Sequence, residues 1–214
     1  MMQTYQNQII QGDCLEVMKK IPTESVDLIV TDPPYVVNYT SRDDRAFPND
    51  NSTAWIEPAF AQAHRVLKKD TFLVCFYGWH KVNYFFNAWR KAGFRTLEQL
   101  IFVKDYPAST GTVQRYHEAA YLMEKGNSPR PQVILRSVLP WQYEGNELHP
   151  TQKPVMTILP LIMAYSRKGD IVLDPFCGSG TTAVAAKLLG RGYIGIEITE
   201  KYARIAQERL KRNS

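Results

Sequence analysis

Short apolar runs rich in β-branched residues alternate along this chain with longer runs of helical periodicity. The strand-like runs are Gln8–Gln11, Val26–Thr31, Thr71–Tyr77, Leu97–Val103, Ala119–Met123, Ile171–Leu173 and Tyr193–Ile198. The helix-like runs are Cys14–Ile21, Thr53–Leu67, Trp79–Ala92, Val155–Tyr165, Gly180–Leu189 and Thr199–Leu210. Such alternation predicts an α/β fold, because parallel strands need crossover connections and helices supply them. We expect a doubly wound, mostly parallel sheet of seven strands.

One pair of strands breaks this alternation. No helical pattern lies between Leu97–Val103 and Ala119–Met123, so these two runs predict an antiparallel hairpin with a long loop. A chain of 214 residues, 44% of them hydrophobic, can bury one substantial core, and no repeat or linker divides it. We therefore expect a single domain over residues 1–214.

The tetrapeptide Asp32-Pro33-Pro34-Tyr35 directly follows the strand-like run Val26–Thr31. In open α/β sheets, ligands are bound at the carboxyl ends of strands. The prolines fix φ and lack an N–H, and Pro33 favours an extended Asp32. The segment thus offers a carboxylate, carbonyl acceptors and an aromatic ring, which suit a planar group that carries an NH2. A proline-rich turn that binds nothing is the alternative.

A glycine-containing loop, DPFCGSGTT at residues 174–182, lies between the apolar run Ile171–Leu173 and a strong helix former. Glycines let the backbone approach a ligand closely, and the helix N-terminus faces that ligand. Glu197 closes the next strand nineteen residues after Gly178, a spacing at which a carboxylate commonly binds ribose hydroxyls. No Gly-Lys-Ser/Thr follows, and Asp174 would repel polyphosphate. The loop therefore suits a ribose-bearing ligand that carries a cation or an amine.

These two motifs and the hexapeptide HPTQKP at residues 149–154 resemble the DNA amino-methyltransferases that use S-adenosylmethionine. Asp32-Pro33-Pro34-Tyr35 is similar to their catalytic motif, the glycine-containing loop to their cofactor loop, and HPTQKP to the segment before that loop. With the catalytic motif first, the order resembles the circularly permuted β class. The likeness extends from Gln11 to the final helix.

The resemblance implies roles for individual residues. It implies catalysis by Asp32, Pro33, Pro34 and Tyr35, and S-adenosylmethionine binding by Asp13, Cys14, His149, Lys153, Asp174, Pro175, Phe176, Gly178, Ser179, Gly180, Thr181, Thr182 and Glu197. Asp13 could equally be the N-cap of the next helix, and both roles can hold at once. Cys14 is expected to pack rather than react, since no nearby charge favours a thiolate.

The implied reaction is methyl transfer to N6 of adenine in DNA. Hydrogen bonds from the amine to Asp32 and the Pro33 carbonyl would aim its lone pair at the sulfonium methyl. Tyr35 would stack on a base flipped out of the duplex. Asp before Pro-Pro-Tyr is linked in the family mostly with adenine and Ser mostly with N4 of cytosine, so cytosine N4 remains the alternative substrate. A catalytically idle nucleic-acid-binding protein of this fold is the alternative of another class.

Two segments without regular periodicity, 36–52 and 126–148, are predicted to recognise DNA, and we expect both to flank the active-site side if each follows a strand at its carboxyl end. A net charge of +5 permits a polyanionic partner. The arginines of these segments can bind phosphates and guanine edges, and the candidates are Arg42, Arg45, Arg130 and Arg136. So little recognition polypeptide predicts a short or degenerate target, or a homodimer with a larger surface. The sequence neither indicates nor excludes a restriction partner. The last helix-like run ends in basic residues, which predicts a helix C-terminus exposed to solvent; these residues are Arg209, Lys211 and Arg212.

Several functional classes do not fit this sequence. The longest apolar stretches, Phe72–Trp79 and Ile158–Tyr165, are too short to span a bilayer, and the N-terminus lacks a signal-peptide pattern. The cysteines, at Cys14, Cys75 and Cys177, are widely spaced and have no metal-ligand spacing. We expect a reduced, cytoplasmic protein with no membrane partner and no metal.

Overall fold

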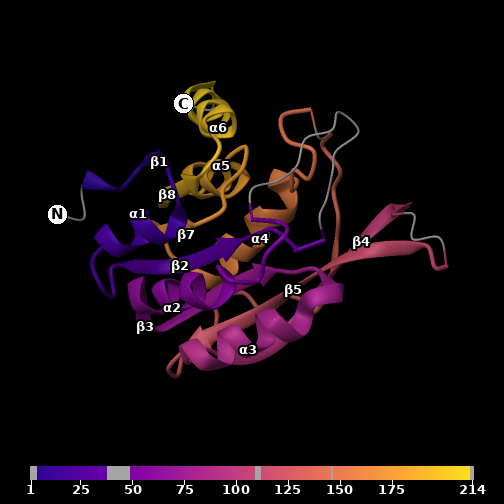
Figure 1. The fold of residues 1–214 in the computed structure, drawn as a ribbon, viewed down its shortest axis with the longest axis horizontal. Helices are drawn as coiled ribbons and strands as arrows, with labels where there is room; N and C mark the ends of the chain where they lie inside the picture. The colour runs from indigo at the N-terminus through magenta and orange to yellow at the C-terminus, as the bar shows by residue number, and fades with distance from the viewer. Residues whose placement is uncertain (1–3, 38–48, 109–111, 146, 213–214) are drawn as a thin grey trace.

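The computed structural model describes residues 4–37, 49–108, 112–145 and 147–212. One sheet lies between two layers of helices (Figure 1). The strands are β1 (Gln8–Gln11), β2 (Val26–Thr31), β3 (Leu67–Phe76), β4 (Arg95–Ala108), β5 (Arg115–Lys125), β6 (Val138–Pro140), β7 (Ile171–Asp174) and β8 (Gly192–Glu197). The helices are α1 (Cys14–Lys20), α2 (Ile56–Val66), α3 (Val82–Ala92), α4 (Val155–Tyr165), α5 (Thr181–Leu188) and α6 (Glu200–Arg212), with a 3-10 turn η2 (Trp79–Lys81).

The sheet has the order β1-β8-β7-β2-β3-β5-β4-β6, which confirms the expected α/β class and the β4–β5 hairpin. Its pairings are parallel except the two that β5 makes with β3 and β4. The described residues form eight strands, one more than the seven predicted. The additional strand is β6, which pairs in parallel with β4 at the sheet edge. It has three residues and ends in Pro140, too short a run for a period of two to reveal.

In the part of the chain that the structure describes, three helices pack on each face of the sheet. Helices α1, α2 and α3 cover one face, and α4, α5 and α6 cover the other (Figure 1). Successive residues of β2 alternate between these layers: Leu28 and Val30 pack with the α4 side and Ile29 with the α1–α3 side. Burial on both faces explains the continuous apolar sequence of this strand. No helix among the described residues is long and apolar enough to cross a membrane.

The chain leaves β2 and β7, which are neighbours in the sheet, in opposite directions. β2 connects through α2 to β3 on one side, and β7 connects through α5 to β8 on the other. Such a switch point leaves a crevice at the carboxyl ends of the two strands, where open α/β sheets bind ligands. Asp32 directly follows β2 and Asp174 ends β7, so both carboxylates lie at this crevice.

The antiparallel strand β5 ends where the parallel strands begin, which is the end of the sheet opposite to the crevice. Its last residue, Lys125, pairs with Thr71 in the first half of β3, and the Ser128 hydroxyl donates to the Thr71 carbonyl at 3.1 Å. We expected the whole segment 126–148 to flank the crevice. That expectation is wrong for its first part, which includes Arg130, because strand direction determines the edge at which a loop begins.

Candidate active site

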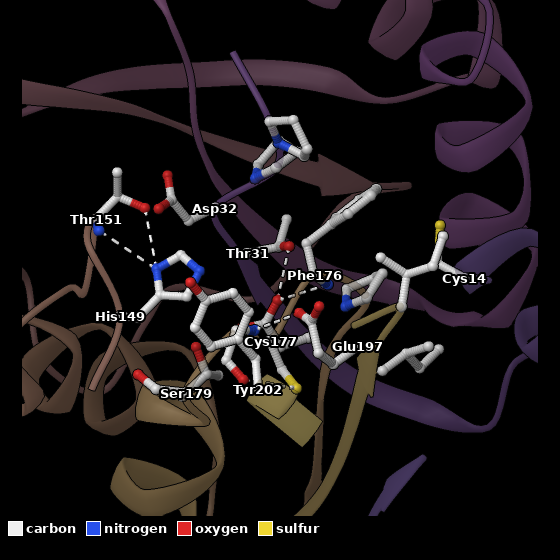
Figure 2. Close-up of a pocket in the computed structure, with 18 of the residues that line it drawn as sticks. Cys14, Thr31, Asp32, His149, Thr151, Phe176, Cys177, Ser179, Glu197 and Tyr202 are labelled. Carbon is white, nitrogen blue, oxygen red and sulfur yellow. Dashed lines mark hydrogen bonds between the residues drawn. The ribbon is translucent and has the colours of Figure 1, made fainter. Parts of the chain in front are cut away.

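A hollow at the switch point is lined by both predicted sets of site residues. It is lined by the predicted catalytic residues Asp32, Pro33, Pro34 and Tyr35, and by the predicted cofactor residues Asp13, Cys14, His149, Lys153, Asp174, Pro175, Phe176, Gly178, Ser179, Thr181, Thr182 and Glu197. In Figure 2, Asp32 lies at the upper left of the residues drawn and Glu197 near their centre. Of the predicted cofactor residues, all of which are described, Gly180 alone does not line it. The structure thus brings together segments far apart in sequence.

The carboxylate of Asp32 is held by two donors. The ammonium of Lys153 donates to one oxygen, and the Tyr35 hydroxyl donates to the other at 2.7 Å. Burial raises the pKa of Asp32, while the Lys153 charge and both hydrogen bonds oppose that rise. The prediction grouped Lys153 with the cofactor residues. Its ammonium instead lies on the predicted catalytic carboxylate, although the residue does line the hollow.

Two residues outside the catalytic segment hold it in place, one beside Tyr35 and one at Val36. Gly78 follows β3, and a Cβ there would lie 2.6 Å from the Tyr35 Cβ, so only a glycine leaves room for this side chain. On the other side, the buried carboxylate of Asp50 accepts the Val36 amide at 2.7 Å. Val36 has φ of 57°, a left-handed conformation that a β-branched residue rarely adopts without such support. One residue of the predicted recognition segment 36–52 therefore fixes the catalytic loop.

Asp174 is a buried carboxylate at the start of the glycine-containing loop. It accepts hydrogen bonds from the Thr31 hydroxyl at 2.8 Å and the Phe176 amide at 3.1 Å. Burial nevertheless raises its pKa to about 6. An amine or a cation in the hollow would favour the ionised form, as the loop motif predicts.

Glu197 lies across the loop from Asp174, at the end of β8. Its carboxylate accepts the Gly178 amide at 2.9 Å and the Thr199 amide at 2.8 Å, and burial raises its pKa. The loop closes at Gly180, whose φ of 82° is left-handed and whose Cβ would lie 2.8 Å from the Cβ of Ala206. A glycine is therefore needed there for both conformation and close approach to α6.

Other predicted residues also have defined partners. Asp13 accepts the Leu15 amide at 2.8 Å as the N-cap of α1, which confirms one of its two predicted roles. Cys14 is buried in the hydrophobic core, which confirms that it packs, and burial raises its pKa to about 12. The His149 ring lies 4.3 Å from that of Tyr202, between centroids (Figure 2). Tyr202 of α6 also lines the hollow, although it was not among the predicted site residues.

The basic end of α6 was predicted to be solvated, but the guanidinium of Arg209 does not end in solvent. Its guanidinium donates to the Thr181 hydroxyl at 2.9 Å and to the Ser179 carbonyl at 3.3 Å. Burial lowers its pKa. The prediction is therefore wrong for Arg209, which supports the glycine-containing loop, whereas Lys211 and Arg212 are exposed.

Two of the four predicted DNA-binding arginines, Arg130 and Arg136, lie among the described residues. Arg42 and Arg45 lie outside the described residues. Arg136 is exposed just before β6, and Arg130 is exposed beyond the end of β5, at the edge of the sheet away from the hollow.

An exposed aromatic and basic cluster lies next to the catalytic segment, and its two aromatic residues, Trp79 and His80, were not predicted to be site residues. Trp79 is 56% exposed and follows Gly78, the residue in contact with Tyr35. Its ring stacks on His80 at 3.7 Å between centroids, and the Arg115 guanidinium lies 5.6 Å from it. The sequence feature that could have revealed this cluster is the Trp79-His80 pair, which follows a buried strand at its carboxyl end.

Comparisons with known proteins agree with this geometry. The model of the DNA methylase family, N6_N4_Mtase, matches residues 26–208. YubD of Escherichia coli (strain K12), a protein named as a methylase, is 47% identical over 204 residues, covering 95% of this chain and 90% of YubD. YhdJ of the same strain, a DNA adenine methyltransferase, is 32% identical over 245 residues, covering 94% of this chain and 82% of YhdJ.

A solved structure extends the likeness to three dimensions. The M1.HpyAVI–SAM complex superposes with a TM-score of 0.75 at 26% identity, covering 95% of this chain and 98% of that one. Since the family model spans most of the chain and these relatives align along nearly all of it, this chain belongs to the DNA methylase family.

Proposed function

We propose that this chain transfers the methyl group of S-adenosylmethionine to N6 of adenine in DNA. The observation that carries the proposal is the shared hollow, which Asp32-Pro33-Pro34-Tyr35 and the Asp174–Glu197 pair line together. The relative named an adenine methyltransferase supports adenine, and the solved complex with SAM supports the cofactor.

The residues of the cofactor half fit the chemistry of S-adenosylmethionine. The Glu197 carboxylate suits ribose hydroxyls, and the buried Asp174 carboxylate suits the amino group of the methionine portion. The bound cofactor supplies an electrophilic methyl on a sulfonium. Glycine at 178 keeps the loop backbone close to the ligand, and Phe176 and Tyr202 add aromatic walls to the hollow.

The catalytic half acts on the amine of the target base. An aromatic amine is a weak nucleophile, because its lone pair is delocalised into the ring. Hydrogen bonds from its two protons to Asp32 and the Pro33 carbonyl favour a pyramidal nitrogen, and the ionised carboxylate stabilises the positive charge that develops there. Because the amine is inaccessible within a duplex, the base is flipped out, and Tyr35 replaces part of its lost stacking.

DNA approaches the carboxyl edge of the sheet in this proposal. The Trp79, His80 and Arg115 cluster adjoins the catalytic segment and offers an exposed ring and a guanidinium, which suit a base and a phosphate. Segment 36–52 begins beside it, and the later part of segment 126–148 returns toward it through β6. Recognition remains predicted for Arg42, Arg45 and Arg136, together with a short target or a homodimer.

The proposal is tested by incubating the protein with methyl-labelled S-adenosylmethionine and mixed-sequence DNA, and then digesting the DNA to nucleosides. Mass spectrometry should find N6-methyldeoxyadenosine after reaction with the wild type, and far less of it after reaction with Asp32→Ala. N4-methylcytosine in its place would establish the alternative substrate, which the family name also covers. Binding of DNA without methyl transfer would support the idle binding protein. Sequencing the modified DNA then gives the target sequence.

A further inference from the structure

The HPTQKP motif predicts that Lys153 binds the cofactor, but its ammonium lies in the catalytic half of the hollow, at Asp32. Its side chain is buried, 9% of the residue being exposed, and its ammonium donates to Asp32. Three aromatic rings surround that ammonium, with centroids 5.5 Å away for Tyr35, 5.2 Å for Phe76 and 6.0 Å for Trp141. Rings at these distances favour a cation and exclude water from the ion pair.

The main chain of Lys153 is attached to the cofactor loop. The Thr181 hydroxyl, at the start of α5, donates to the Lys153 carbonyl at 3.0 Å. Arg209 of α6 donates in turn to that hydroxyl at 2.9 Å. One residue therefore touches the glycine-containing loop through its backbone and the catalytic carboxylate through its side chain.

A second carboxylate balances the charge of Lys153. Glu118 of β5 faces the cluster and forms an ion pair with Lys104 of β4. Burial alone would raise the pKa of Glu118, but Lys153, Lys104 and Arg115 together hold it below its ordinary value. Asp32, Lys153, Glu118 and Lys104 thus form an alternating set of charges that sums to zero.

We propose that Lys153 is a positioning residue of the catalytic centre. Its ammonium keeps the Asp32 carboxylate ionised and turned toward the substrate amine, and its backbone ties that orientation to the cofactor loop. A carboxylate has about four acceptor positions, so the Lys153 and Tyr35 donors leave positions free for the amine of the base. The inference rests on the proposed function, in which Asp32 acts as the ionised acceptor.

The charged and titratable groups that face Asp32 among the described residues all enter the expected pH dependence. Lys153 and Tyr35 favour its ionised form by donating hydrogen bonds, whereas Glu118 on β5 opposes it by charge. Asp174 on β7 and the Cys75 thiol on β3 also face it. Of these groups, Lys153 supplies the positive charge in direct contact, so its removal should make Asp32 harder to ionise.

The test combines three measurements on Lys153→Met, Lys153→Arg and the wild type. Calorimetry gives the affinity for S-adenosylmethionine, and single-turnover methyl transfer at saturating cofactor gives the rate between pH 5 and 9. Carbon-13 NMR of labelled Asp carboxyls, with Asp32→Asn to assign the signal, gives the pKa of Asp32 without DNA. Lys91→Met, which removes an exposed lysine on α3, is the matched control.

The proposal predicts that Lys153→Met raises the pKa of Asp32 and moves the acid limb of the rate upward by about one pH unit or more. At pH 7 the rate should fall roughly tenfold or more, while cofactor affinity stays within about threefold. Lys153→Arg should restore the acid limb, because it keeps the charge. Lys91→Met should match the wild type in all three measurements.

Two results would overturn the proposal. One is a large loss of cofactor affinity in Lys153→Met with the rate and its pH profile unchanged, which would make Lys153 a cofactor contact. The other is an unchanged pKa of Asp32. If Lys153→Met does not fold, Glu118→Gln decides: removing the opposing carboxylate should lower the pKa of Asp32, and no shift would refute the cluster.

This design separates the inference from the proposed function. The NMR titration needs neither DNA nor methyl transfer. A wild type that methylates no adenine would refute the proposed function, yet the titration would still show whether Lys153 controls Asp32.

Discussion

The carboxylate of Asp174, at the end of β7, accepts a hydrogen bond of 2.8 Å from the hydroxyl of Thr31, at the end of the neighbouring strand β2. Both side chains are buried. The bond joins the strand before the cofactor loop to the strand before the catalytic segment, at the switch point of the sheet. Changes at Asp174 should therefore affect the stability of both halves of the site.

Replacing Asp174 by Asn should change how stability depends on pH. The pKa of Asp174 is about 6 in the folded protein against an ordinary value of 3.8, so the fold binds this proton more tightly than the unfolded chain does. The group's contribution to the free energy of unfolding thus decreases as pH rises from about 4 to 6. Asp174→Asn should be more stable than the wild type at pH 8, by at most about 3 kcal/mol, with less difference near pH 4. Urea unfolding at several pH values measures this, and parallel curves would contradict it.

Glu197→Ala should weaken S-adenosylmethionine binding by roughly tenfold to a hundredfold, the usual range for a hydrogen bond to a charged group. The carboxylate holds the loop amide of Gly178 and is the candidate partner of the ribose. Calorimetric titration measures the change, with circular dichroism to show that the fold persists. Glu16→Ala, an exposed carboxylate of α1, is the control. Equal affinity in the two variants would remove Glu197 from the cofactor site.

Asp32→Ala should lower the rate of methyl transfer by roughly a hundredfold or more, because the carboxylate of Asp32 acts on the amine. The variant should still bind the cofactor. Tyr35→Ala should be less severe and Tyr35→Phe milder still, since stacking needs only a ring. The structure adds one effect: the Tyr35 hydroxyl donates to Asp32, so Tyr35→Phe should raise the pKa of Asp32 slightly. Its rate should therefore fall more at pH 6 than at pH 8. Wild-type turnover in Asp32→Ala would refute the mechanism.

Arg209→Met should lower cofactor affinity severalfold although this residue does not line the hollow. Its guanidinium supports the Ser179 carbonyl and the Thr181 hydroxyl, and the loop would lose that support. Arg212→Met, on the exposed end of the same helix, is the matched control. Calorimetry on both variants decides, and indistinguishable affinities would mean that the loop holds its shape without Arg209.

Arg115→Ala should weaken DNA binding. It should also lower the slope of log affinity against log salt concentration by about one, which corresponds to the loss of one phosphate contact. The reason is its place beside exposed Trp79, next to the catalytic segment. Arg130→Ala, at the opposite edge of the sheet, should bind as the wild type does. Fluorescence anisotropy at several salt concentrations compares them. A larger effect at Arg130 would place the DNA on the other edge.

Local sequence patterns were sufficient for most of the fold. The runs at β2, β7 and β8 are apolar and each ends in a distinctive residue or motif, so their strands and the loops after them could be predicted. The N-cap role of Asp13 and the packing of Cys14 also followed from neighbouring residues. The short strand β6 could not be predicted, because three residues carry no period and pairing with β4 alone makes them a strand.

The order of residues along the chain specifies which side chains follow each strand, and hence that Asp32, Asp174 and Glu197 meet at the carboxyl ends of parallel strands. Which distant groups meet them there depends on how the whole chain folds. Lys153 reaches Asp32 across 121 positions, Arg209 folds back on the cofactor loop, and the direction of β5 puts Arg130 at the far edge. Periodicity reports how a segment buries its own side chains, whereas these contacts depend on how separate segments are packed and in which direction they run.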